Sequence, residues 1–295
     1  MREEVIGGQR LILGDCLDIL QELPAASCDT VLTDPPYPGI KRSYGYWTEA
    51  EWHAMMDVVV PECRRVLKPT GSAVYILQPN SEKVGRMRPW LWEFMAKWTR
   101  DWGMVQDAWW WNHAALPSGG ATSHGLPRQS VKACAWFGEP DCFRDQSSVL
   151  WEPSAAALAL VSSDRALKHY PSGRTMNHGR VADAIASRGG VTPFNLLPVA
   201  NTNSTDSAGS NGHGAGTPLA LCDWWLRYIC PPGGTVLEPF MGSGTVLVAA
   251  ELQGKQGTGI ECVPEYFDIA CRRVKEAVRK READAAQLTL ATGTA

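Results

Sequence analysis

Apolar and polar positions follow a repeated strand, helix, strand order in the first half of the chain. Residues 9–15 (QRLILGD) are typical of a strand, residues 16–23 (CLDILQEL) of a helix and residues 29–34 (DTVLTD) of a second strand. A helix at 49–67 and a strand at 72–78 continue this order. Strands that alternate with helices predict a parallel sheet. We therefore expect an α/β fold with a doubly wound, mostly parallel sheet.

The periodic pattern is interrupted once and then returns. Between Asp145 and Gly216, Ser, Gly, Asn and Pro replace the apolar periodicity, which predicts an inserted irregular region. The remaining expected elements are helices at 89–102, 217–229, 244–254 and 265–282 and strands at 104–112, 130–137, 234–240 and 256–262. The expected divisions are a first half at 1–144, the insertion at 145–216, a second half of the same domain at 217–282 and a flexible tail at 283–295.

The composition predicts a folded globular protein without a membrane helix. Of its 295 residues, 44% are hydrophobic and 20% are charged, as in ordinary globular domains. No run reaches the roughly 18 apolar residues of a membrane helix, and the amino terminus MREEVIGGQR lacks the apolar core of a secretion signal. We expect a cytoplasmic protein.

Cysteine and charge counts bear on the class of site. The nine cysteines are odd in number and include no C-x-x-C pair, so we expect neither a disulfide framework nor a zinc site, and we predict no metal. The net charge of −3 argues only weakly against a nucleic-acid partner, because an average conceals local patches.

A glycine-rich turn between a strand and a helix is the first candidate binding site. Residues 235–261 read as a buried strand, a turn from Phe240 to Gly244, a helix and a second strand that ends in Glu261. This layout is typical of a nucleoside-binding unit, in which glycine permits close backbone approach and the terminal acid suits a ribose diol. The turn lacks the longer glycine fingerprint of a dinucleotide site. Acids around it suit a positively charged ligand such as S-adenosylmethionine, and a plain strand-turn-helix is the alternative.

The stretch Asp34-Pro35-Pro36-Tyr37 is the second candidate site. It is at least a stiff turn, because two prolines exclude a helix and commonly end a strand. The acid also falls at the carboxyl end of a strand, where open α/β folds place their sites. An exocyclic amine of a nucleobase is a poor nucleophile, and the Asp34 carboxylate with the Pro35 carbonyl could accept both of its hydrogens. Tyr37 could stack on the base.

Together the two motifs resemble the amino-directed DNA methyltransferases, in the subclass where DPPY precedes the glycine-rich element. The resemblance covers nearly the whole chain and includes GDC before TDPPY, VLKPTG before a strand, LPSGG in a loop, TPLAL before the last strand-helix-strand unit and EPFMGSGT followed by GIE. It implies a class I, Rossmann-like fold, S-adenosylmethionine as cofactor and double-stranded DNA as substrate, with the target base flipped out of the duplex. It also implies target recognition at 145–216 and S-adenosylmethionine binding at 217–282. We expect a homodimer; whether a cognate restriction enzyme exists is left open.

The resemblance further implies a role for each motif residue. The catalytic pocket would be formed by Asp34, Pro35, Pro36 and Tyr37. The cofactor would contact Asp15, Cys16, Asp34, Thr217, Glu238, Pro239, Phe240, Gly242, Ser243, Gly244, Thr245, Glu261 and Cys262. DNA would contact Lys41, Arg42, Arg165, Lys168, Arg174, Asn177, His178 and Arg180, which are residue types that meet phosphates and base edges.

The implied reaction is direct methyl transfer to adenine N6, which needs positioning and arranged charge rather than a protein nucleophile. Asp34 as the first motif letter resembles adenine enzymes, whereas cytosine-N4 enzymes usually carry Ser there. Thr217-Pro218 stands where the family often has Lys-Pro, a departure that puts the cofactor contact at this point in question. The alternatives are a cytosine-N4 methyltransferase and a catalytically silent DNA-binding regulator. A protein-glutamine methyltransferase disagrees with both the acid and the motif order.

Overall fold

A computed structural model gives the fold. The described residues are 2–41, 45–114, 123–156, 159, 168–169, 171–173, 175–176, 183, 185–201 and 216–292. They form two compact units, one made of Met1–Arg144 with Asn195–Ala295 and the other of Asp145–Phe194.

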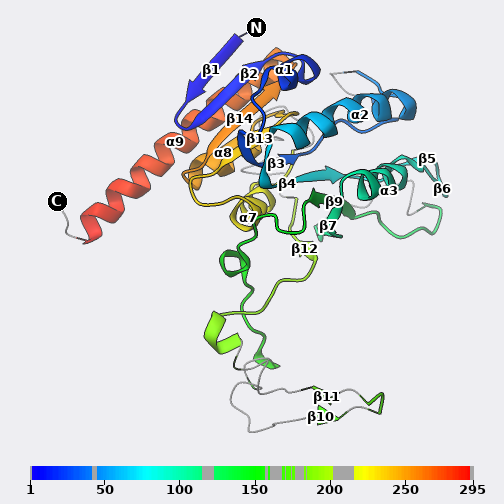
Figure 1. The fold of residues 1–295 in the computed structure, drawn as a ribbon, viewed down its shortest axis with the longest axis vertical. Coiled ribbons are helices and arrows are strands. Elements are labelled where there is room, and N and C mark those ends of the chain that lie inside the picture. Colours follow the sequence, from blue (N-terminus) through cyan, green and yellow to red (C-terminus); the bar gives the residue numbers. More distant parts are fainter. Residues whose placement is uncertain are drawn as a thin grey trace. The chain divides into compact units, whose positions relative to one another are not determined.

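The first unit is built on a large mixed sheet (Figure 1). In sheet order its strands are β1 (Arg2–Ile6), β2 (Gln9–Leu13), β14 (Gln256–Glu261), β13 (Thr235–Glu238), β3 (Cys28–Thr33), β4 (Leu67–Leu77), β9 (Val131–Gly138), β8 (Trp109–Trp111) and β12 (Leu196–Pro198), with β7 (Met104–Gln106) also pairing β9. The five neighbours from β2 to β4 run parallel. On one side β1 is antiparallel to β2, and on the other β9 is antiparallel to β4.

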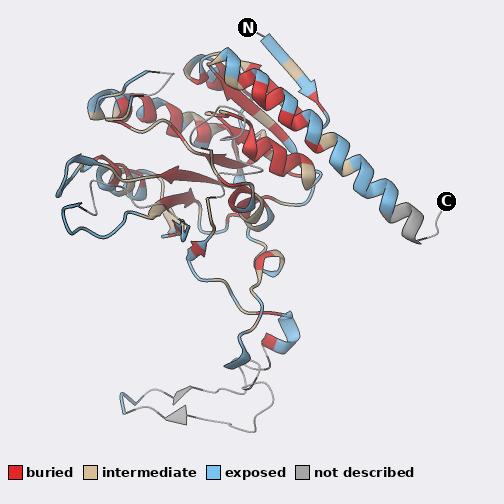
Figure 2. Cartoon of the chain, turned by 180° about the vertical axis from the view of Figure 1, so that it is seen from behind, coloured by how far each residue is buried: buried red, intermediate tan, exposed pale blue. Residues whose placement is uncertain are grey.

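Helices cover both faces of this sheet. They are α1 (Cys16–Glu22), α2 (Glu49–Val66), α3 (Trp90–Asp101), α7 (Leu219–Ile229), α8 (Thr245–Leu252) and α9 (Pro264–Thr292). Successive side chains of a strand point to opposite faces. On β3, accordingly, Val31 packs in one cluster with α1, α2 and α3, whereas Leu32 packs in another with α7 and α8. Buried side chains therefore pack on both faces of the sheet. Figure 2 shows that buried residues make up most of the central strands and alternate with exposed residues along the helices. The doubly wound α/β prediction is confirmed for the central strands.

Two helix starts show how local sequence fixes these elements. Thr48 precedes α2 and forms a capping box with Glu51, in which each side chain bonds to the backbone of the other residue. Asp15 precedes α1 and accepts a hydrogen bond from the backbone N–H of Leu17. Each cap sits between a strand end and a helix, so it also fixes the loop at that edge of the sheet.

The structure also contains elements that the pattern does not predict. Strand β1 and the hairpin of β5 (Ser81–Lys83) and β6 (Arg86–Met87) are short and mostly exposed, so they carry little apolar periodicity. Helix α9 continues past residue 282 to Thr292, within the segment expected as a tail. Alanine and leucine are frequent there and favour a helix even without burial. None of the described helices is both long and apolar enough to cross a membrane.

The second unit, Asp145–Phe194, contains a short 3-10 helix (Gln146–Val149) and the strand pair β10 (Lys168–His169) and β11 (Thr175–Met176). A bridge between Trp151 and Val191 brings its two ends together. The chain rejoins the first unit at Asn195, earlier than the Gly216 boundary expected from composition, because β12 adds to the large sheet.

Candidate active site

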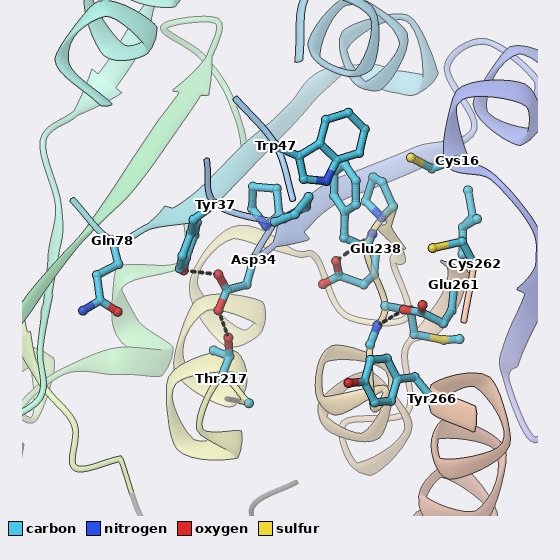
Figure 3. Close-up of a pocket in the computed structure, with 18 of the residues that line it drawn as sticks. Cys16, Asp34, Tyr37, Trp47, Gln78, Thr217, Glu238, Glu261, Cys262 and Tyr266 are labelled. Carbon is cyan, nitrogen blue, oxygen red and sulfur yellow. Dashed lines mark hydrogen bonds between the residues drawn. The ribbon is translucent and has the colours of Figure 1, made fainter. Parts of the chain in front are cut away.

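The motif residues meet at one edge of the sheet because they follow neighbouring parallel strands. Asp34 comes directly after β3, Glu238 ends β13 and Glu261 ends β14. Asp15 follows β2 after one glycine. The carboxyl ends of parallel strands share an edge, which is where open α/β sheets hold ligands. A cavity of about 620 Å³ lies at this edge and is lined by all four residues. Figure 3 shows Asp34, Glu238 and Glu261 in this cavity.

Asp34 is held by donors on both oxygens of its carboxylate. The Tyr37 hydroxyl donates to Oδ1, and Thr217 Oγ1 donates to Oδ2 over 2.8 Å. Lys132 Nζ, from β9, lies 3.6 Å from the same Oδ2 and donates to the Tyr37 hydroxyl over 3.2 Å. The Asp34 side chain remains 22% exposed, so this carboxylate is fixed in place yet open to the cavity.

The prolines that follow Asp34 are tied down by tryptophan and asparagine side chains. Trp52 Nε1 donates to the Pro36 carbonyl over 2.6 Å, and Asn80 Nδ2 donates to the Pro38 carbonyl over 2.6 Å. Asn80 in turn accepts from Trp90 Nε1 at 3.0 Å. The Pro35 carbonyl receives no hydrogen bond from any described residue. A rigid loop therefore places an acid and an available carbonyl next to each other.

Tyr37 lines the cavity and has an aromatic neighbour, and its stacking on the target base stays a prediction. Its ring packs on Trp90 with centroids 6.2 Å apart and planes inclined by 27°, while its hydroxyl bonds to Asp34. In this arrangement the Tyr37 hydroxyl holds the Asp34 carboxylate in place.

Glu238 and Glu261 form a second, more buried group of acids. Glu238 Oε1 accepts from Thr33 Oγ1 at 2.5 Å and from the Phe240 backbone N–H at 3.2 Å. Glu261 accepts from the backbone N–H groups of Gly242 at 2.7 Å and Val263 at 2.8 Å. Burial raises the pKa of both carboxyls above the ordinary value, most strongly for Glu238.

The glycine-rich turn is braced from α9. Gly244 has φ of +78°, and a Cβ there would lie 2.9 Å from Ala270 Cβ, so only glycine fits without strain. The buried Arg273 donates to the carbonyl and hydroxyl of Ser243 and to Thr245 Oγ1, at 2.7 to 3.0 Å. These polar groups of the turn are thereby fixed from below, while its backbone remains at the cavity wall.

Comparisons with known proteins identify the family to which this site belongs. The profile of a DNA methylase family, the N6 and N4 methyltransferases, matches residues 28–272. The chain belongs to this family. M.PvuII, a type II methyltransferase of Proteus hauseri, is 23% identical over 282 residues, covering 89% of this chain and 82% of the relative. YhdJ, a DNA adenine methyltransferase of Escherichia coli, is 27% identical over 272 residues, covering 90% and 82%.

Solved structures show the same fold as this DNA methylase. The cytosine-N4-specific PvuII DNA methyltransferase superimposes with a TM-score of 0.70 at 20% identity, covering 94% of this chain and 93% of that one. TTHA0409 of Thermus thermophilus, a putative DNA modification methylase complexed with S-adenosylmethionine, has a TM-score of 0.56 at 20% identity, with 92% and 95% covered. The class I, Rossmann-like fold is thus confirmed.

The cavity of this DNA methylase is lined by most of the residues that the sequence predicts for the site. Among the expected catalytic and cofactor-binding residues, Gly244 is the exception, since it supports the turn from outside the lining. Cys16 is buried, and burial raises the pKa of its thiol well above the ordinary value, whereas Cys262 is exposed. Thr217 contacts Asp34 directly, a role that the sequence does not indicate.

The expected DNA-contacting residues are only partly described. Lys41 is exposed, and Lys168 belongs to β10 in the second unit. The others lie outside the described residues: Arg42, Arg165, Arg174, Asn177, His178 and Arg180.

Several residues of the cavity wall are missed by sequence reasoning. They are Trp47, Gln78, Asn80, Gln129, Lys132 and Tyr266. Gln78 directly follows β4, so the rule that sites lie at carboxyl strand ends could have found it. Lys132 could not have been found in this way, because it enters the site from an antiparallel strand whose neighbour depends on the fold.

Proposed function

We propose that this protein transfers a methyl group from S-adenosylmethionine to the N6 amine of adenine in double-stranded DNA. The observation that carries the proposal is a single cavity lined by two groups of acids, which we call its open end (Asp34) and its enclosed end (Glu238 and Glu261) according to their burial. At one end Asp34 is hydrogen-bonded and open, beside the available Pro35 carbonyl. At the other end Glu238 and Glu261 are buried beside the glycine-rich turn.

The second end fits S-adenosylmethionine. Its two carboxylates suit the ligand's positive charge, and Glu261, at the end of β14, suits a ribose diol. The volume of about 620 Å³ lies within the range of small-molecule sites. When bound, S-adenosylmethionine supplies an electrophilic methyl group on a sulfonium. Residues Asp15, Cys16, Glu238 and Glu261 would hold it, with the backbone from Pro239 to Thr245.

At the first end, Asp34 and Pro35 would hold the target amine. The amine is reachable only after the base leaves the helical stack. One of its hydrogens would bond to the Asp34 carboxylate and the other to the Pro35 carbonyl, which directs the nitrogen lone pair toward the methyl donor. Positioning of this kind supplies much of the rate in a direct transfer. Tyr37 and Thr217 hold the carboxylate in the orientation that this requires.

Two observations bear on which base is methylated. Asp34 as the first letter of the motif favours adenine, as does the likeness to YhdJ. The structural likeness to a cytosine-N4-specific enzyme makes N4 methylation of cytosine the second candidate. Both reactions present an exocyclic amine to the same two acceptors, so the proposed mechanism is the same for either base.

DNA would also be held outside the cavity. Lys41 follows the rigid DPPY loop, and basic residues of 145–194 would meet phosphates and bases. A homodimer stays a prediction.

Nucleoside analysis tests the proposal. Unmethylated plasmid DNA is incubated with the protein and S-adenosylmethionine, digested to nucleosides and measured by mass spectrometry. We expect N6-methyldeoxyadenosine. N4-methyldeoxycytidine instead would establish the second candidate, and no methylated nucleoside in DNA that the protein nevertheless binds would indicate a silent regulator. Sequencing that detects modified bases then gives the recognition sequence.

A further inference from the structure

Lys132 is the only basic side chain among the described residues that line the cavity. The acids Asp15, Asp34, Glu238 and Glu261 line the same space. The Lys132 side chain is 19% exposed, so most of it is shielded from water. A buried charge is costly unless it is paired, which makes a lysine at this position informative.

The hydrogen bonds of Lys132 leave part of its capacity unused. An ammonium carries three N–H donors. Of the described residues only Tyr37 accepts a hydrogen bond from it, at 3.2 Å. The distance of 3.6 Å to Asp34 Oδ2 is that of an ion pair and exceeds a normal hydrogen bond.

Two aromatic rings hold the ammonium where it is. Nζ lies 5.4 Å from the centre of the Tyr37 ring and 4.9 Å from that of Trp110, within the range of cation–π attraction. Trp110 is itself fixed, since its Nε1 donates to the Val199 carbonyl at 2.7 Å. The ammonium is therefore positioned beside Asp34 with donors to spare.

Asp34 and Lys132 thus present an acceptor and a donor side by side. Asn and Gln recognise adenine through the same combination, accepting from its amine and donating to the ring nitrogen next to it. Adenine and cytosine both carry an amine beside a ring nitrogen that accepts. Guanine and thymine carry a carbonyl oxygen in place of that amine, which a carboxylate repels.

We propose that Lys132 donates a hydrogen bond to the ring nitrogen beside the methylated amine, so that Asp34 and Lys132 together recognise the amino edge of the target base. The inference rests on the proposed function and deepens it, because it names a contact that selects amino bases. A donor on the ring nitrogen withdraws electron density from the amine. The contact therefore orients the base and rejects carbonyl bases, and does not activate the nucleophile.

Base analogues that lack one ring nitrogen test this contact. Duplexes carrying the recognition sequence are made with adenine, 7-deazaadenine or 1-deazaadenine at the target position, and kcat/KM is measured for the unchanged protein and for Lys132→Met. We expect one analogue to lower kcat/KM of the unchanged protein by about ten- to a hundredfold, the size of a base-edge contact. Lys132→Met should be slower on adenine by a similar factor and should not distinguish adenine from that analogue. Effects of the analogue on the amine itself cancel in this comparison. For a cytosine target, 3-deazacytosine replaces both analogues.

Two further variants control the test. Lys132→Arg keeps the donors and should keep the penalty for the analogue. Lys68→Met removes a lysine whose Nζ lies 2.8 Å from Asp29 Oδ2, and neither residue lines the cavity. This variant should behave as the unchanged protein. If Lys132→Met does not show the melting curve of a folded protein, Lys132→Ala takes its place. The contact would be overturned if the analogue lowered kcat/KM of Lys132→Met as much as that of the unchanged protein. It would also be overturned if no analogue lowered kcat/KM of the unchanged protein. A protein that methylates no DNA would instead overturn the proposed function.

Discussion

The two groups of acids in the cavity differ in their exposure and in the groups that hydrogen-bond to their carboxylates. Asp34 keeps 22% of its side chain exposed and is held by the hydroxyls of Tyr37 and Thr217, with the Lys132 ammonium as an ion-pair partner. Glu238 and Glu261 are buried and bonded mainly to backbone N–H groups of nearby turns, and burial raises their pKa. Neighbouring strand ends of one sheet thus provide one acid that is open to the cavity and two that are enclosed. In our proposal the open acid meets a base that arrives with DNA, while the enclosed acids meet the methyl donor.

The largest effect should come from removing the open acid. Asp34→Ala removes the acceptor for the target amine, and we expect the methylation rate to fall by roughly a thousandfold, as for a residue that handles protons at a reacting group. The measurement is incorporation of labelled methyl groups into DNA. Asp57→Ala, which changes an exposed aspartate on α2, should leave the rate unchanged. A rate for Asp34→Ala within tenfold of the unchanged protein would remove Asp34 from the reaction.

The next largest effect should be a loss of stability when the glycine-rich turn beside Glu238 and Glu261 is altered. Gly244→Ala places a Cβ 2.9 Å from Ala270 Cβ at a φ of +78°. We expect a loss of about 1–2 kcal/mol from the left-handed backbone alone, and more from the clash. Gly254→Ala is the matched control, because its φ is +66° but a Cβ there meets nothing within 4 Å. Urea unfolding should show the larger loss for Gly244→Ala, and equal losses would mean that the turn is not tightly packed.

A smaller effect should follow from the hydroxyl that orients the open acid. Thr217→Val keeps the shape of the side chain but removes the donor to Asp34 Oδ2. Since a hydrogen bond of this kind contributes on the order of 1 kcal/mol, we expect the methylation rate to fall about fivefold. Thr217→Ser should retain the rate. If Thr217→Ser is as slow as Thr217→Val, the hydroxyl is not what matters at this position.

The smallest effect concerns pH and the enclosed acids. Burial raises the folded-state pKa of Glu238 above 4.5, so from that pH upward the folded protein holds a proton that the unfolded chain has released. Its contribution to stability therefore falls as pH rises toward the raised pKa. Glu238→Gln stays neutral throughout and should gain stability relative to the unchanged protein between pH 5 and pH 8. Melting curves at both values measure this, and a relative loss of stability at the higher pH would contradict it.

How far the sequence predicts the site depends on the kind of contact. Asp34, Glu238 and Glu261 could be placed together because each ends a strand of a parallel sheet, a relation that local periodicity reveals. Lys132 could not, since its meeting with Asp34 depends on the antiparallel register of β9. Thr217 was expected at the cofactor, but its bond to Asp34 could not be foreseen, because it depends on where α7 begins. The hairpin of β5 and β6 was missed for a related reason, because exposed strands carry no apolar pattern.

The central claim is that Asp34 contacts the base whereas Glu238 contacts the methyl donor. Calorimetric titration of S-adenosylmethionine into Asp34→Ala and Glu238→Gln tests it. We expect Asp34→Ala to bind S-adenosylmethionine within about fivefold of the unchanged protein, because the open acid contacts the base. Glu238→Gln should bind it at least about tenfold more weakly, because the bound cation favours the ionised form of Glu238 and a charge-assisted contact contributes roughly 1.5–3 kcal/mol. Loss of binding in Asp34→Ala together with unchanged binding in Glu238→Gln would contradict the account.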